Sequence, residues 1–141
     1  MRRFLPYNPD LARLILRLAL AAVLLYHGIP KWLNFGATVV GFEGMGLPAP
    51  QLTAAVALLA EVGGGLLILL GVAVDIAGLL VILDMLGAII LVHWAHGFDF
   101  AKGGWEHPFT VLAMALTLAL AGPGRLTVGK NYKGAERRRR D

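Results

Sequence analysis

The chain has 141 residues, of which 57% are hydrophobic and only 16% are charged. Soluble domains are nearer one quarter charged, so this composition excludes an ordinary soluble domain and favours a protein of the lipid bilayer. The net charge of +4 comes mainly from basic residues near the two termini, where a phospholipid surface is a better acidic partner than nucleic acid.

The first apolar run covers residues 11–29 and follows Asn8 and Pro9, a pair typical of a capped helix start. We expect Pro30 to close or kink this helix. Residues 31–50 mix aromatic and apolar side chains with glycines, and this mixture predicts a short interfacial helix followed by a turn.

Three further apolar runs follow, at about residues 51–70, 75–94 and 108–121. Runs of roughly 15 to 20 residues can cross a hydrocarbon core of about 30 Å. The second and third runs are so close in sequence that they must form a tight antiparallel hairpin. The alternating pattern of barrel strands is absent, so the sequence predicts an all-α fold. We expect a four-helix transmembrane bundle with a short interfacial helix between its first and second spans.

Four spans place both termini on the same side of the membrane. That side carries most of the basic residues, whereas the other side carries Lys31 and Lys102. By the positive-inside rule, both termini are expected in the cytoplasm and the chain in the cell inner (plasma) membrane, as a multi-pass protein. Residues 1–128 are the predicted transmembrane domain, and residues 129–141 are a basic cytoplasmic tail.

Three ionisable residues, Arg17, Glu61 and Asp84, lie within the apolar runs. Ionisable groups at such depth need partners, and helix rise places all three well inside the bilayer. We therefore expect Arg17 to pair with Glu61 or Asp84. Two interpretations stay open, and they can coincide. The three residues form a polar lock that sets helix register, or they form a proton or quinone site, because carboxyl groups in apolar surroundings can exchange protons.

A second group of polar residues gathers where the predicted helices meet at the outer end of the bundle. Its members are His27, Lys31, His93, His96, Glu106 and His107. This group is a candidate polar vestibule for a small molecule such as a quinone headgroup. The four histidines are also candidate metal ligands, although histidines at a membrane interface are commonly just polar residues that reach water. The chain has no cysteine, so thiolate metal sites and dithiol chemistry within it are excluded.

Several short motifs, taken together, resemble the DoxX family of small bacterial and archaeal membrane proteins. They are Arg17; Tyr-His-Gly-Ile-Pro-Lys at 26–31; Gly-Leu-Pro-Ala-Pro at 46–50; Glu61 with glycines at 63–65 and 71; Gly-Gly-Trp-Glu at 103–106; and Gly-Pro-Gly at 122–124. Their order and spacing span residues 11–127. The resemblance implies a four-helix membrane protein with a loose association with respiratory or redox chemistry. Family relatives include a subunit of thiosulfate:quinone oxidoreductase.

The chain departs from the family pattern at two places. Residues 74–75 are Val-Asp where a Thr-Arg pair is common, and Asp84 stands where an apolar residue is usual. The additional acid distinguishes this chain from the usual family pattern.

Three functions follow from these observations. The first is a membrane subunit of a quinone-linked oxidoreductase, not catalytic alone, in which Arg17, Glu61 and Asp84 handle protons while His27 and Lys31 lie near a quinone. The second is a non-enzymatic scaffold that recruits a soluble redox or stress enzyme. The third is a small oligomeric transporter or channel. The expected partners are the lipid bilayer, a redox-enzyme subunit and further copies of the chain, and not nucleic acid.

Overall fold

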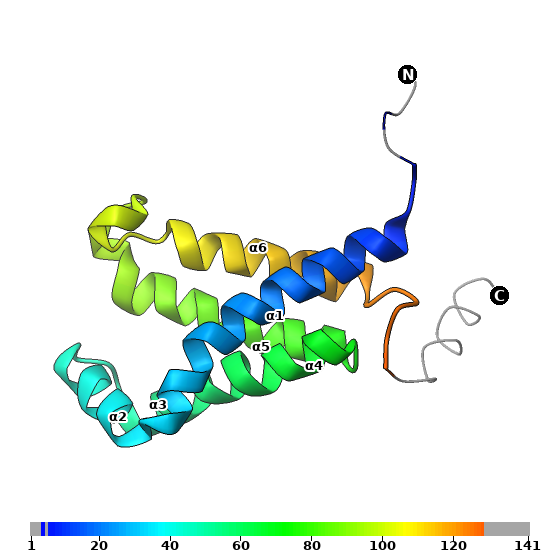
Figure 1. Ribbon diagram of the computed structural model, residues 1–141. Helices are drawn as coiled ribbons and strands as arrows, with labels where there is room; N and C mark the ends of the chain where they lie inside the picture. The colour runs from blue at the N-terminus through cyan, green and yellow to red at the C-terminus, as the bar shows by residue number, and fades with distance from the viewer. Residues whose placement is uncertain (1–3, 5, 129–141) are drawn as a thin grey trace.

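The structure, a computed structural model, describes residue 4 and residues 6–128. The predicted basic tail at 129–141 lies outside the described residues. Within them every regular element is a helix, and the helices pack as a bundle with a short helix folded back at one end (Figure 1). The predicted all-α, four-helix architecture is therefore confirmed.

Four helical rods make up the bundle. They are α1 (Pro9–Leu33); α3 (Pro50–Leu58) continued by the π-helical turn η1 (Leu59–Gly64) and α4 (Gly65–Leu70); α5 (Val74–Ala88) continued by the π-helical turn η2 (Ile89–His93) and the 3₁₀ turn η3 (Trp94–His96); and α6 (Glu106–Ala121). The first three rods, of 25, 21 and 23 residues, are long and apolar enough to cross a membrane, whereas α6 is shorter. The short helix α2 (Phe35–Gly44) joins the first two rods, and the 3₁₀ turn η4 (Phe100–Lys102) precedes α6.

The ends of the rods follow from local chemistry, with one exception. The Asn8 side chain accepts a hydrogen bond from the Leu11 backbone N–H at 3.0 Å, as the predicted cap requires. Pro30 does not end the first helix, which continues to Leu33. Its missing N–H removes one helical bond, but the Pro30 carbonyl accepts a hydrogen bond from the Asn34 N–H at 3.1 Å, which closes the last turn.

The core lies where the four rods meet. Leu20, Ile68, Val81 and Leu118 come from four different helices and are each 0% exposed. Close helix approach depends on small residues: a Cβ built on Gly78 of α5 would lie 3.0 Å from the Ala119 Cβ of α6.

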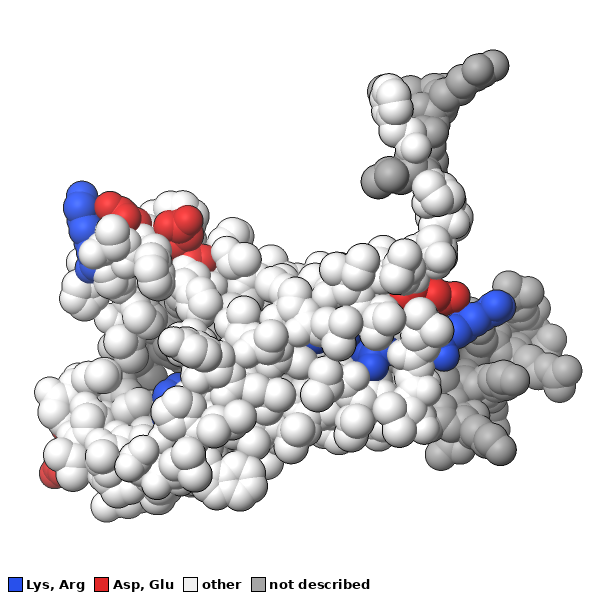
Figure 2. All heavy atoms as spheres, viewed as in Figure 1, with Lys and Arg blue, Asp and Glu red and all other residues white. Residues whose placement is uncertain are grey.

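The outer faces of the rods carry exposed large apolar side chains along their length. Figure 2 shows that acidic and basic side chains gather toward the two ends of the molecule and leave the middle of this face almost free of charge. An apolar surface of this kind needs lipid around it. The helices are therefore membrane-embedded, and their outer faces contact the bilayer.

Arg17 ties three segments together at the end of the bundle near the termini. Its side chain is buried, and it donates hydrogen bonds to four backbone carbonyls: Nε to Ile68 at 2.8 Å, Nη2 to Leu69 at 2.6 Å, and Nη1 to Pro123 at 3.2 Å and Leu126 at 2.6 Å. The last carbonyls of a helix have no partner within the helix and carry partial negative charge. The guanidinium therefore satisfies the end of α4 and joins α1 to the segment after α6.

The turn between the second and third rods leaves space for this guanidinium. Gly71 has φ +75°, and a Cβ there would lie 2.7 Å from the Arg17 Cζ. The Gly71 and Val72 N–H groups donate back to the carbonyls of Ile68 and Leu67 at 3.2 and 3.0 Å, which closes the helix end. Glycine is required here both for the positive φ and for the close approach of Arg17.

The expected pairing of Arg17 with Glu61 or Asp84 is wrong. Gly28, not Arg17, lies level with Glu61: a Cβ on Gly28 would be 2.9 Å from the Glu61 Cβ. Gly28 is three turns further along α1 than Arg17, a distance of about 16 Å. The expected pairing assumed that all helices begin at the same depth in the membrane. In the structure, α1 begins well before the level of the turn that joins the second rod to the third.

We expect Arg17→Gln to lower the free energy of unfolding by about 2–4 kcal/mol, because several carbonyls lose a charged donor in a buried place. Arg17→Lys should restore part of the loss, since a single ammonium cannot span the same acceptors. Unfolding in mixed SDS micelles, followed by circular dichroism, measures the difference.

Arg13→Gln is the matched control for this prediction. Arg13 lies one turn earlier on α1 and forms a half-exposed pair with Asp10 at 3.4 Å. It should change the unfolding free energy by less than about 1 kcal/mol. Equal stability of Arg17→Gln and the unsubstituted protein would contradict a stabilising role of the hydrogen bonds from Arg17 to the four backbone carbonyls.

Candidate functional site

A cavity of about 590 Å³ opens at the end of the bundle that lies away from the termini. Figure 2 shows the surface hollowed there, between the lobe formed by α2 and the lobe formed by the loop around η3 and η4, with a basic side chain visible inside. The walls are mainly apolar, and they include Val23, Phe42, Leu52, Val56, Leu83 and Leu91. Six ionisable residues also line the cavity: His27, Lys31, Glu61, Asp84, His93 and His107.

Lys31 and Glu61 form an ion pair on the cavity wall. The Lys31 Nζ donates to both Glu61 carboxylate oxygens, at 2.5 Å to Oε1 and 2.6 Å to Oε2. The Glu61 side chain is 7% exposed and that of Lys31 27%, so each charge depends on the other for compensation. Lys31 is in the last turn of α1, where the helix dipole also favours a cation.

The position of Glu61 depends on a local irregularity in the second rod. Glu61 lies within the π-helical turn η1, where the chain carries one extra residue per turn. The same turn meets α1 at Gly28, where a Cβ would lie 2.7 Å from the Val62 Cγ2. The absence of a side chain at Gly28 thus lets η1 approach α1 one turn before Lys31. The glycines that follow Glu61 pack on other helices: a Cβ on Gly64 would lie 3.2 Å from the Val81 Cγ2.

Asp84 reaches the same cavity from α5, without a partner of its own. Its Oδ2 is buried and accepts no hydrogen bond within the described residues. The charges of Glu61 and Lys31 both act on the Asp84 carboxyl. A buried polar atom without a partner costs about 1–3 kcal/mol, and such an atom in a cavity wall requires an explanation.

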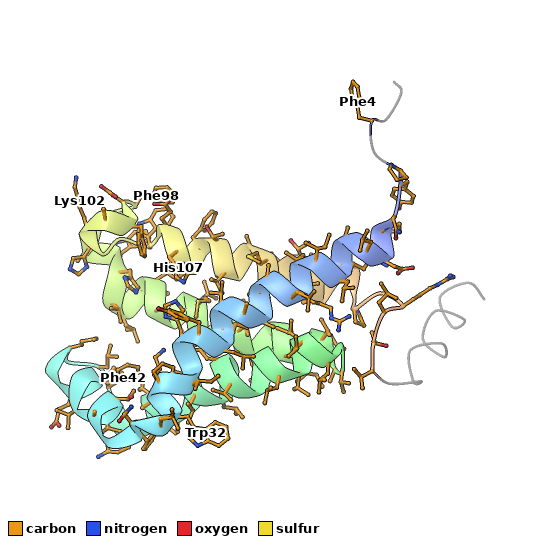
Figure 3. All side chains as sticks on the ribbon, viewed as in Figure 1. Phe4, Trp32, Phe42, Phe98, Lys102 and His107 are labelled. Carbon is orange, nitrogen blue, oxygen red and sulfur yellow. The ribbon has the colours of Figure 1, made fainter. Side chains whose placement is uncertain are left out.

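Three histidines surround the mouth of the cavity. The rings of His27 and His107 lie 5.1 Å apart between centroids, and the His93 Nδ1 is 2.7 Å from the Gly103 carbonyl oxygen. Figure 3 shows His107 at the start of α6 and Phe42 on α2, on opposite sides of the opening. These imidazoles provide hydrogen-bonding groups beside an apolar space.

The four histidines considered as candidate metal ligands do not form a metal-binding group. The His96 Nδ1 lies 3.2 Å from the Val92 carbonyl oxygen of its own helix end, and His96 does not line the cavity. His27 and His107 pack ring against ring instead. Across the described residues, no three histidine, aspartate or glutamate side chains are grouped so as to hold a metal ion.

The two sites expected from the sequence are thus largely one. Glu61 and Asp84 from the expected internal charges share the cavity with His27, Lys31, His93 and His107 from the expected outer vestibule. Arg17 lies outside this cavity and donates to four backbone carbonyls at the other end of the bundle. Glu106 also lies outside the cavity lining, and its Oε2 accepts a hydrogen bond from the Phe100 N–H at 3.2 Å.

The apolar walls were not foreseen in the sequence. Helix α2 folds back against α3, which brings Phe42 and Met45 to the cavity. The signal for this fold-back was the turn at residues 46–50, where Gly46 has φ +73° and Leu47 is buried. A turn motif predicts a change of direction, but it does not say against which helix the chain returns.

Comparison with known proteins agrees with this architecture. The family described as DoxX matches residues 12–94, more than half of the chain. The chain belongs to the DoxX family. This match covers nearly all of the first three rods, and it includes Lys31, Glu61 and Asp84 of the cavity.

Two curated relatives extend the match of this DoxX chain to most of its length. The inner membrane protein YphA of Escherichia coli strain K12 is 29% identical over 125 residues, covering 83% of this chain and 87% of YphA. The putative oxidoreductase CatD of Bacillus subtilis strain 168 is 32% identical over 113 residues, covering 80% and 81% of the two chains. No solved structure matches the chain significantly.

In this DoxX chain we expect Gly28→Ala to destabilise the fold by about 1–3 kcal/mol, because the added methyl group would press against Val62 and Glu61. Gly36→Ala is the control, since a Cβ there meets nothing within 4 Å, and it should leave stability equal or raise it by up to about 1 kcal/mol. SDS unfolding of both variants checks this. Equal effects of the two substitutions would argue against close packing at Gly28.

Proposed function

We propose that the cavity binds a lipid-soluble quinone and that the chain is the membrane subunit of a quinone-linked oxidoreductase. The observation that carries the proposal is the convergence of Lys31, Glu61 and Asp84 on one apolar cavity inside a membrane bundle. Ligand sites are mostly apolar concavities with a few convergent polar groups, and about 300–1,000 Å³ is their usual size.

The cavity suits a molecule with an apolar ring and polar oxygens. Phe42, Leu52 and Leu83 offer apolar surface to a ring or a hydrocarbon tail, and His27 and His107 offer hydrogen-bonding groups at the mouth. The unpartnered Asp84 oxygen adds a polar atom that a ligand can satisfy. A quinone, when bound, would supply reversible two-electron chemistry.

The redox part of the proposal rests on the similarity of this chain to other proteins. The relative CatD is named a putative oxidoreductase, and the DoxX resemblance implies redox chemistry. Because the chain contains no cysteine, it offers no dithiol of its own, and electrons would pass between the ligand and a partner redox enzyme. The role of this chain is then to bind the ligand and to hold or move protons beside it.

We also infer that the termini face the cytoplasm, so that the cavity opens toward the opposite side. The basic residues of the sequence are concentrated near the termini, whereas the cavity end carries Lys31 and Lys102. Lys31 is already neutralised by Glu61. This asymmetry in lysine and arginine is what sets orientation in bacterial inner membranes.

Binding of a decyl-substituted benzoquinone to the purified protein, measured by calorimetry in nanodiscs, tests the function. Gly87→Phe should lower the affinity at least about tenfold, because Gly87 lines the cavity and a Cβ there meets nothing within 4 Å. The phenyl group can therefore occupy ligand space without a clash at its Cβ.

The control for this experiment is Gly41→Phe on α2. A Cβ on Gly41 also meets nothing within 4 Å, but Gly41 does not line the cavity. The Gly41→Phe variant should therefore bind the benzoquinone as tightly as the unsubstituted protein does. Absence of quinone binding to the unsubstituted protein would refute the proposed function.

The absence of native cysteines makes the orientation directly testable. Lys102→Cys should react with a membrane-impermeant maleimide in intact cells, because its side chain is 76% exposed at the cavity end. Arg125→Cys, at the terminal end and 79% exposed, should react only after the cells are opened. The reverse labelling pattern would place the termini outside.

A further inference from the structure

Asp84 differs from every other charged group near the bundle interior. Lys31 and Glu61 satisfy each other, with both carboxylate oxygens accepting from one ammonium. The Arg17 N–H groups donate to backbone carbonyls at the opposite end of the bundle. The Asp84 Oδ2, by contrast, is buried in the wall of the cavity and has no hydrogen-bond partner among the described residues.

Few protein groups around Asp84 are free to donate a hydrogen bond to its Oδ2. Glu61 accepts two of the three N–H groups of the Lys31 ammonium, at 2.5 and 2.6 Å, and the side chains of the flanking cavity residues Leu83, Met85 and Gly87 have no N–H or O–H group to donate. Leaving a buried oxygen unsatisfied is unfavourable. A molecule in the cavity can supply the partner that none of the described residues gives to this atom.

We propose that Asp84 is the residue that hydrogen-bonds an oxygen on the ring of the cavity ligand. This inference rests on the proposed function, and it names the contact that makes the site selective. A carboxyl group can donate when it is protonated and can only accept when it is ionised. Asp84 can therefore bind a ring carbonyl as an acid and a ring hydroxyl as a carboxylate, which are the groups of a quinone and of its quinol.

The Lys31–Glu61 pair has a different part in this arrangement. Because its two charges compensate each other, the pair contributes a fixed dipole to the cavity wall. Asp84 contributes an oxygen atom that has no hydrogen-bond partner among the described residues. The site should therefore prefer a ring that carries an oxygen over a hydrocarbon ring of the same size. A site that hydrogen-bonds an oxygen discriminates strongly against an analogue that lacks it, because the site's own polar group is then left unpaired.

The test compares the affinities of Asp84→Leu and Asp84→Asn for the decyl benzoquinone and for decylbenzene, in nanodiscs. Asp84→Leu should lower the affinity for the quinone about tenfold and leave binding of decylbenzene unchanged or tighter. Asp84→Asn keeps both a donor and an acceptor, so it should stay within about threefold of the unsubstituted protein for the quinone.

Leu83→Ala, next to Asp84 in the cavity wall, is the matched control. It removes apolar contact and should weaken both ligands by similar factors. Thermal unfolding of each variant verifies that the bundle is intact, and the isosteric Asp84→Asn keeps the test valid if Asp84→Leu fails to fold.

The outcomes separate this inference from the proposed function. Quinone binding that Gly87→Phe abolishes but Asp84→Leu leaves unchanged would overturn the role of Asp84 and retain the quinone site. Equal loss of quinone and decylbenzene in Asp84→Leu would also overturn it, because the effect would then be one of shape. Selective loss of the quinone, with retention in Asp84→Asn, is the result expected.

Discussion

The bundle depends on how one buried cation is satisfied. Arg17 donates to carbonyls from α4 and from the segment after α6, so a single side chain sets the longitudinal position of α1 against two other parts of the chain. Lipid offers no hydrogen bonds to replace these contacts. Because α1 is held at this level, its other end extends to where Gly28 and Lys31 meet η1.

The two ends of the molecule therefore use charge in different ways. At the terminal end, the Arg17 side chain donates to four backbone carbonyls and joins three segments of the chain. At the cavity end, Lys31 and Glu61 neutralise each other while Asp84 keeps a buried oxygen unpaired. The buried charge at the terminal end thus holds segments of the chain together, whereas at the cavity end a polar atom is left open to the cavity.

Much of the fold could be predicted from the sequence because apolar run length and helix-end chemistry are local. The Asn8 cap and the short turn at Gly71 were both predicted correctly. Pro30 was less informative, because the helix continues past it to Leu33 and its carbonyl still accepts from the Asn34 N–H. The π-helical turn at Glu61 was not predicted from the sequence, because it lies within a continuous helix: the residues that flank it, Leu58 and Gly65, have ordinary α-helical dihedral angles.

The residue types of the site were also evident in the sequence, because ionisable groups in apolar runs are rare and expensive. The sequence by itself determined a helical membrane protein of the DoxX family with buried charges. Which charges meet was decided by the tertiary structure alone: Arg17 with carbonyls, Lys31 with Glu61, and Asp84 with the cavity. The reason is that partner choice depends on the relative height and rotation of the helices, which long-range packing sets and no single run encodes.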